Sequence, residues 1–84
     1  MAVYFDSVGH LISDTSLEEL HDFATKKLGL KRAWFQGEGT YKIHYDLTTA
    51  RARERAAAAG ATEVSQKMLL TILQNAPYQH KDVG

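Results

Sequence analysis

The sequence predicts a small single domain of the α+β class, with a mixed sheet of three to five strands and two to three helices packed on one of its faces. Short aromatic or β-branched segments alternate with segments of helical periodicity, and no linker-like stretch divides the chain. A chain of 84 residues can build only one core. We expect the order β-β-α-β-β-α-β-α over residues 1–76, followed by a frayed tail at 77–84.

The chain begins with a predicted β-hairpin. Residues 2–5 (AVYF) have strand composition, and residues 6–9 (DSVG) have turn composition. Residues 10–13 (HLIS) then return as the second strand. A first helix follows, because Ser16 and Glu19 form the S-x-x-E capping box and apolar residues recur at helical spacing until Gly29.

The middle of the chain predicts a second pair of strands and a second helix. Residues 31–36 (KRAWFQ) and 41–47 (YKIHYDL) have strand composition and are joined by the glycine-rich stretch 37–40. Residues 49–59 are rich in Ala, Arg and Glu, which favours a helix. Asp46, Thr48 and Thr49 are all suitable N-caps for it, and we favour Asp46.

The last part of the chain predicts a short strand at 61–64 and a third helix from Gln66, capped by Ser65 and ended before Pro77. This helix is apolar over a wide arc. Its outer side could either make a dimer contact or be fully used in covering the sheet.

Composition excludes several classes of function. Ten basic and ten acidic residues balance, so electrostatic capture of nucleic acid or of an anionic membrane is not expected. The sequence has no cysteine, hence no disulfide framework and no thiolate metal site. Neither a membrane-spanning run nor a signal peptide is recognisable, and a cytoplasmic location is expected.

Strand alternation groups the polar residues of the middle segment. Ile43, Tyr45 and Leu47, with Tyr41, would share one face of their strand, and Lys42, His44 and Asp46 the other. If residues 31–36 pair with this strand, Trp34 and Gln36 join the polar face. An indole, an amide, an imidazole and a carboxylate would then converge, provided that the register holds.

The run HLISDT, LEELHDFA, KKLGLKRAWFQ and then HYDLT resembles an uncharacterised domain family of bacteria and their phages. Typical members carry H-[LM]-I-A-D-T, E-L-H-x-[FM]-A, G-L-x-R-x-W-[FH]-Q and H-Y-D-[LIV]. The resemblance covers residues 2 to about 64 and implies positions rather than a reaction. The polar positions of the family pattern fall on Asp6, His10, Asp14, His21, Trp34, Gln36, His44, Tyr45 and Asp46.

This chain departs from the family pattern at its N-terminal turn. Three residues separate Asp6 from His10, where family members usually have a longer and often basic segment. A contribution of that segment to a site would be missing here.

Several chemical interpretations fit these side chains. His10, Asp14, His44 and Asp46 are acceptable metal ligands, but without a fixed spacing motif we predict no metal site and identify no cofactor. A His–Asp pair can move protons near neutral pH, yet no serine or cysteine stands in a nucleophile motif, so catalysis stays open.

Binding of a small polar or nucleotide-like ligand is the function we favour. The predicted ligand-binding residues are His10, Asp14, Trp34, Gln36, His44, Tyr45 and Asp46. The alternative is a phage or bacterial protein-binding module that docks on a host enzyme or defence complex through an exposed Trp34 or the third helix.

Overall fold

Four strands form one mixed sheet in the computed structural model, which describes residues 2–38 and 42–79. Their order is β3-β2-β1-β4. Antiparallel pairs join β2 to both β1 and β3, whereas β4 runs parallel to β1. The strands are β1 (Val3–Phe5), β2 (His10–Ser13), β3 (Tyr45–Asp46) and β4 (Thr62–Glu63). The α+β class is thereby confirmed.

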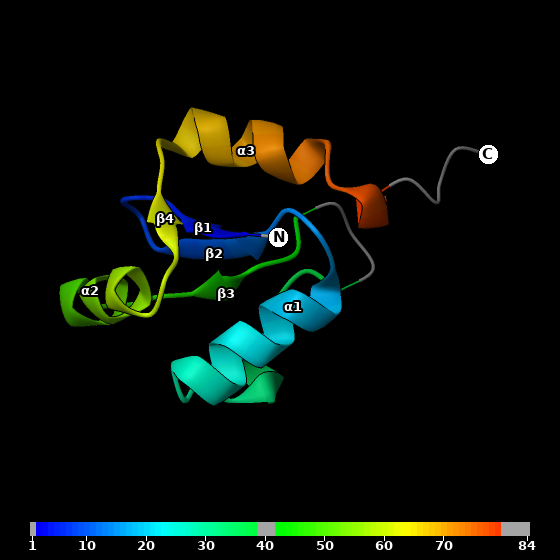
Figure 1. Cartoon of the computed structure of the whole chain (residues 1–84). Coiled ribbons are helices and arrows are strands. Elements are labelled where there is room, and N and C mark those ends of the chain that lie inside the picture. The colour runs from blue at the N-terminus through cyan, green and yellow to red at the C-terminus, as the bar shows by residue number, and fades with distance from the viewer. Residues whose placement is uncertain (1, 39–41, 80–84) are drawn as a thin grey trace.

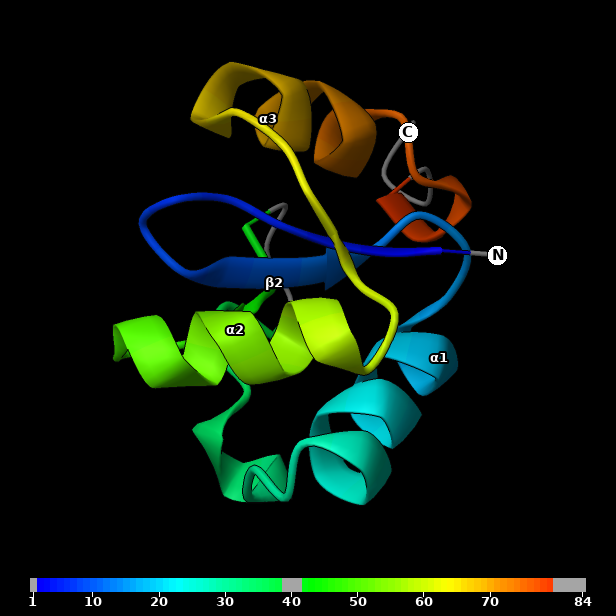
Figure 2. The same cartoon turned by 60° about the vertical axis from the view of Figure 1, so that its left-hand side comes forward.

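Helices cover both faces of this sheet, so the expected packing on one face is wrong (Figures 1 and 2). Helix α3 (Gln66–Gln74) lies on one side, and α1 (Leu17–Asp22) and α2 (Ala50–Ala58) lie on the other. The central strand explains the difference. Leu11 and Ile12 point to opposite faces and both are fully buried, so each face needs a cover.

The core lies mainly between the sheet and the α1–α2 layer. Val3, Phe5 and Leu11 point into it from β1 and β2. The alternation predicted for the segment before the second helix is confirmed for its described residues, because Ile43, Tyr45 and Leu47 are buried. Tyr41 lies outside the described residues.

The strand predicted over residues 31–36 is wrong. Arg32–Trp34 forms a 3-10 turn, and only Gln36 pairs with the sheet edge, through two backbone hydrogen bonds with His44 of 2.9 and 3.0 Å. The turn satisfies its backbone groups locally, with the Trp34 and Phe35 amides donating to Lys31 and Arg32. The short connection from α1 back to the sheet edge thus forms a turn, although the composition of this segment favours a strand.

Capping residues mark the helix starts. The Ser16 hydroxyl accepts from the Glu19 amide, the Thr49 hydroxyl from Ala52 and the Ser65 hydroxyl from Met68. The prediction of Asp46 as the cap of α2 is wrong, because Asp46 is still paired in β3. After α1 the chain continues through a π-helical turn, Phe23–Lys27, and Gly29 at φ +72° ends it as predicted.

Residues Pro77–Gln79, part of the segment expected to fray, form a 3-10 turn. The Tyr78 hydroxyl donates a hydrogen bond to the backbone carbonyl of Ser13. Residues 80–84 lie outside the described residues. No helix in the described part of the chain has the length and apolar character needed to cross a membrane.

Tyr78 makes folding stability depend on alkaline pH. Burial, with smaller effects from Asp14 and Glu19, raises its pKa from 10.0 to about 12. In the unfolded chain the phenol ionises near pH 10, so stability falls as the pH rises from about 10 to about 12. Urea unfolding of Tyr78→Phe should therefore show a free energy that declines less steeply over this range than in the wild type. Parallel curves for the two proteins would contradict the burial of Tyr78.

Candidate functional site

The hairpin loop between β1 and β2 is organised by the carboxylate of Asp6, which is 1% exposed. Its Oδ1 accepts from the backbone amides of Val8, Gly9 and His10 at 3.1, 2.8 and 2.9 Å. Its Oδ2 lies 2.9 Å from Nδ1 of His10. An aspartate that accepts from the amides following it in a turn is a local structural motif. The same carboxylate also fixes the His10 ring.

The charge of Asp6 sets the tautomer of His10, that is, which ring nitrogen carries the hydrogen. Burial alone would raise the pKa of the Asp6 carboxyl, but hydrogen bonds from the His10 ring and from the His10 and Gly9 amides outweigh burial and lower it. An ionised carboxylate only accepts, so Nδ1 of His10 carries the hydrogen. The Nε2 atom of neutral His10 then presents a lone pair.

His44 is held in the same tautomer by a different group. Its Nδ1 lies 2.7 Å from the backbone carbonyl oxygen of Lys42, which can only accept a hydrogen bond. Its Nε2 lies 3.2 Å from Oδ1 of Asp46. In neutral His44 this places a nitrogen lone pair against a carboxylate oxygen, an arrangement that is favourable only with a cation or a proton between the two atoms.

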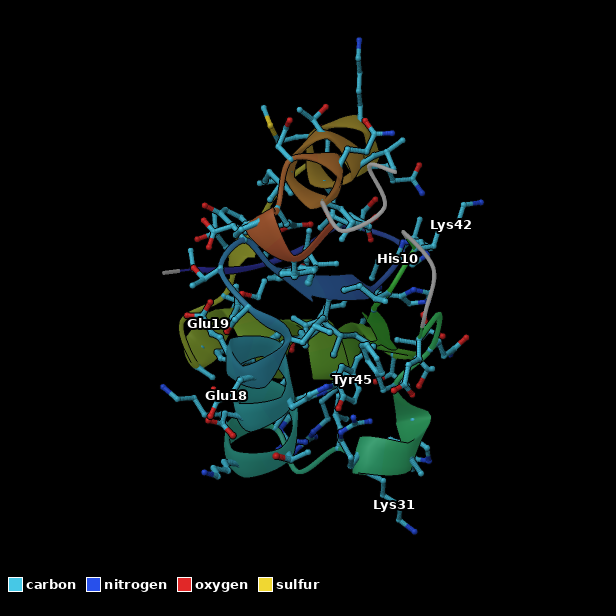
Figure 3. All side chains as sticks on the ribbon, turned by 90° about the vertical axis from the view of Figure 1, so that its right-hand side faces the viewer. His10, Glu18, Glu19, Lys31, Lys42 and Tyr45 are labelled. Carbon is cyan, nitrogen blue, oxygen red and sulfur yellow. The ribbon has the colours of Figure 1, made fainter. Side chains whose placement is uncertain are left out.

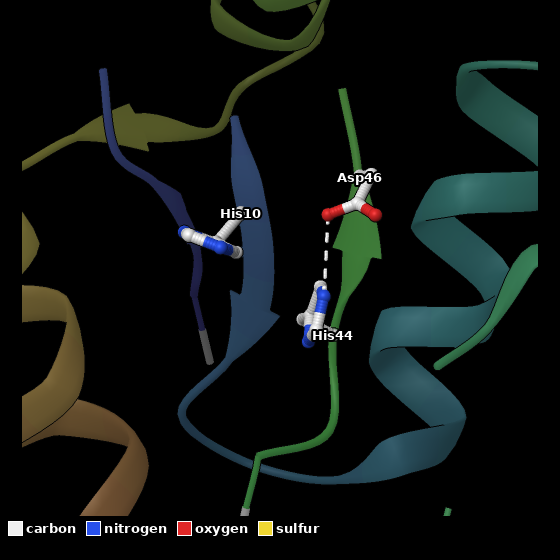
Figure 4. Close-up of side chains that lie close together, drawn as sticks. All are labelled: His10, His44 and Asp46. Carbon is white, nitrogen blue, oxygen red and sulfur yellow. Dashed lines mark ion pairs between the residues drawn. The ribbon is translucent and has the colours of Figure 1, made fainter. Parts of the chain in front are cut away.

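The pairing of β2 with β3 completes a three-residue cluster (Figure 4). Asp46 lies opposite His10 in the antiparallel register, and the rings of His10 and His44 are 5.1 Å apart. One ligand-type atom from each of His10, His44 and Asp46 lies within 4.8 Å of the others. The second carboxylate oxygen of Asp46 accepts from the side-chain amide of Gln36. We call His10, His44 and Asp46 the histidine–aspartate cluster.

A groove of about 310 Å³ opens beside this cluster, between the sheet and α3. Ile12, Leu69, Leu70 and Leu73 supply its apolar wall. His10 and Lys42 lie on this side of the molecule, whereas Tyr45 lies beneath the sheet (Figure 3). His44, Asp6 and Gln66 also line the groove, so one end of it is polar.

Trp34 is placed beside the cluster but outside this groove. Its side chain is 51% exposed and lines a separate groove of about 480 Å³, which Gln36 and Asp46 also line. Four of the predicted residues, His10, Gln36, His44 and Asp46, are thus brought together directly. Trp34 lies at their edge.

Asp14 and Tyr45 are not brought into the cluster. Asp14 lies four residues from His10, about 13 Å along an extended strand. It accepts from the Ala2 amide at 2.9 Å and from the Thr15 hydroxyl at 2.8 Å. Tyr45 is fully buried on the opposite face, with its hydroxyl 2.8 Å from Nδ1 of His21. Burial lowers the pKa of His21, which favours the neutral ring and a packing role.

Sequence reasoning missed three parts of the site. Asp6 appeared as a family position but not as the partner of His10, although an aspartate before S-V-G is a recognisable turn signal. The apolar arc of α3 in the sequence indicates only a sheet cover or a dimer contact, and not a groove wall. The Lys42 carbonyl has no sequence signal, because a backbone acceptor depends on conformation alone.

A comparison with family models matches residues 3–76 to the family described as protein of unknown function (DUF4031). No curated protein and no solved structure matches the chain.

Stability measurements should separate the structural aspartate from the aspartate of the cluster. Asp6→Ala leaves three loop amides and the His10 ring without their acceptor, and should lower the free energy of unfolding by about 3 kcal/mol or more. Asp46→Ala removes a partly exposed side chain and should cost less than about 1 kcal/mol. Urea unfolding of both variants measures this difference. Equal losses would show that the cluster is also part of the folding scaffold.

Proposed function

We propose that this chain, which belongs to the DUF4031 family of proteins of unknown function, binds a small polar or nucleotide-like ligand. The ligand occupies the groove between the sheet and α3, with its polar end at the histidine–aspartate cluster. One observation supports this most strongly. An apolar groove ends at two imidazoles and a lysine, and most ligand sites combine an apolar wall with a few convergent polar groups.

The chemistry of the groove selects a ligand with two unlike ends. Leu69, Leu70 and Leu73 suit a flat or aliphatic body, such as a nucleobase. Lys42 and the two histidines suit a carboxylate or a phosphate. A volume of about 310 Å³ is at the small end for ligand sites, so a mononucleotide or a smaller acid fits better than a dinucleotide.

Asp46 limits the charge that such a ligand can bring. A bare carboxylate near a phosphate is unfavourable unless a cation lies between the two. Gln36 already occupies one oxygen of Asp46, and His44 faces the other. The ligand's anionic end is therefore placed nearer to His10 and Lys42 than to Asp46.

The alternative function is docking on another protein. Trp34, Met68 and Leu70 are each about half exposed, and exposed large apolar side chains are common anchors of interfaces. This alternative includes a phage or bacterial protein that docks on a host enzyme or defence complex, and a dimer through α3. It does not require the histidines to be oriented, whereas the ligand proposal does.

A thermal-shift screen tests the ligand proposal with a matched pair of variants. Nucleoside monophosphates and small dicarboxylates are tested with and without added Zn²⁺. A bound probe at about 100 times its Kd should stabilise the fold by about 2.7 kcal/mol. Leu70→Gln, which alters the groove wall, should weaken probe binding by about tenfold and so reduce the thermal shift. Met68→Gln, on the same helix but not lining the groove, should retain it.

The outcomes divide the two functions. A probe-dependent shift that is reduced in Leu70→Gln and kept in Met68→Gln supports the groove as the binding site. No shift with any probe, or equal loss in both variants, would contradict the proposal and favour docking on a protein.

A further inference from the structure

We propose that Nε2 of His10, Nε2 of His44 and Oδ1 of Asp46 bind one divalent transition-metal ion, with Zn²⁺ as the best match. The role of this ion in receiving the ligand's anionic end rests on the proposed function. Metal binding itself is measurable without any ligand. Two imidazoles and one carboxylate are a donor set that suits first-row divalent ions.

The spacing of His44 and Asp46 matches such an ion. Their facing atoms are 3.2 Å apart. An ion with bonds of about 2.1 Å to both atoms would see them at an angle of about 100°, between the octahedral and tetrahedral values. Where His44 is neutral, the ion would also replace the unfavourable contact between its lone pair and the carboxylate oxygen with two attractive bonds.

His10 supplies the third donor after a small adjustment. One ring nitrogen of each histidine and one carboxylate oxygen of Asp46 lie within 4.8 Å of one another, whereas two ligands of a tetrahedral Zn²⁺ ion are about 3.4 Å apart. An inward swing of at most about 1.4 Å closes this difference. The side chain of His10 is 38% exposed, so the ring has room to tilt about its hydrogen bond to Asp6.

Each of the three donors has its own supporting partner. Asp6 holds Nδ1 of His10, the Lys42 carbonyl holds Nδ1 of His44, and the Gln36 amide holds the second oxygen of Asp46. Metal-binding histidines almost always donate their other N–H to a carboxylate or a carbonyl, and ligating carboxylates are hydrogen-bonded in turn. A simple His44–Asp46 ion pair explains neither the orientation of His10 nor this set of partners.

Three protein donors leave at least one coordination position open, as in ligand-binding and catalytic sites rather than closed structural ones. The groove lies next to the cluster, because His10 and His44 line it. A carboxylate or phosphate oxygen of the groove ligand could complete the coordination. The ion would then also remove the conflict between Asp46 and an anionic ligand.

Metal titration of the chelator-treated and dialysed protein tests the inference. Co²⁺ binding is followed by its visible absorption and Zn²⁺ binding by calorimetry, at about pH 7.5, where imidazoles are available. The wild type should bind one equivalent. His10→Ala, His44→Ala and Asp46→Ala should each weaken binding by about 100-fold or more, and Gln36→Ala by about 10-fold.

Two matched controls separate the cluster from the general surface. His21→Gln removes a histidine whose ring contacts Tyr45 on the opposite face, and Asp22→Ala removes an exposed acid. Both should bind Co²⁺ and Zn²⁺ as the wild type does. Circular dichroism of every variant checks that the fold is retained.

The result that overturns the inference is distinct from the failure of the proposed function. Absence of stoichiometric binding, or equal binding by the wild type and the cluster variants, would overturn the metal site. Probe-dependent stabilisation that persists without metal would then leave the ligand function standing. Metal binding lost in the cluster variants, without any probe-dependent shift, would support the metal site while contradicting the proposed ligand.

Discussion

The register of β2 against β3 is the constraint on which the site depends. Asp46 lies opposite His10 and Tyr45 opposite Leu11. The Leu47 amide extends this pairing by donating to the Gly9 carbonyl at 2.6 Å. Gly9 has φ +106°, and a Cβ at this position would overlap the Leu47 carbonyl oxygen. A shift of one residue would send His10 and Asp46 to opposite faces of the sheet and destroy the cluster.

The same short strands carry core residues on one face of the sheet and the residues of the candidate site on the other, because side chains alternate along a strand. Leu11, Tyr45 and Leu47 point into the layer covered by α1 and α2, where each is at most 1% exposed. His10, His44 and Asp46 point to the other face, next to the α3 groove. Among the described residues, no buried side-chain polar atom lacks a hydrogen-bond partner. The buried Asp6 carboxylate that orients His10 therefore leaves the described part of the fold with no unsatisfied buried side-chain polar atom.

Local signals in the sequence were enough to predict much of the fold. Alternation placed Ile43, Tyr45 and Leu47 in the core, and capping residues Ser16 and Ser65 marked two helices. The sequence could not predict the 3-10 turn at Arg32–Trp34, because its aromatic composition favours a strand in isolation. It could not place helices on both faces either, since Leu11 and Ile12 are adjacent in a short segment whose pairing partners are distant in sequence.

The site was predictable to the extent that it depends on alternation in a single segment. His44 and Asp46 are two residues apart on one strand, and Gln36 joins them through one bridge. Asp14 was grouped with them by residue type, but a strand carries it about 13 Å from His10. The partners that orient the two imidazoles, a carboxylate in a turn and a backbone carbonyl, depend on tertiary geometry.

The tautomers of His10 and His44 test the central claim most directly. Long-range ¹H–¹⁵N spectra of the ¹⁵N-labelled protein with one equivalent of Zn²⁺ distinguish protonated from unprotonated ring nitrogens. The hydrogen bonds to Asp6 and to the Lys42 carbonyl predict that Nδ1 carries the hydrogen and Nε2 carries none in both residues. Hydrogen on Nε2 of either ring would contradict the arrangement, because that ring would have no lone pair to offer the cluster.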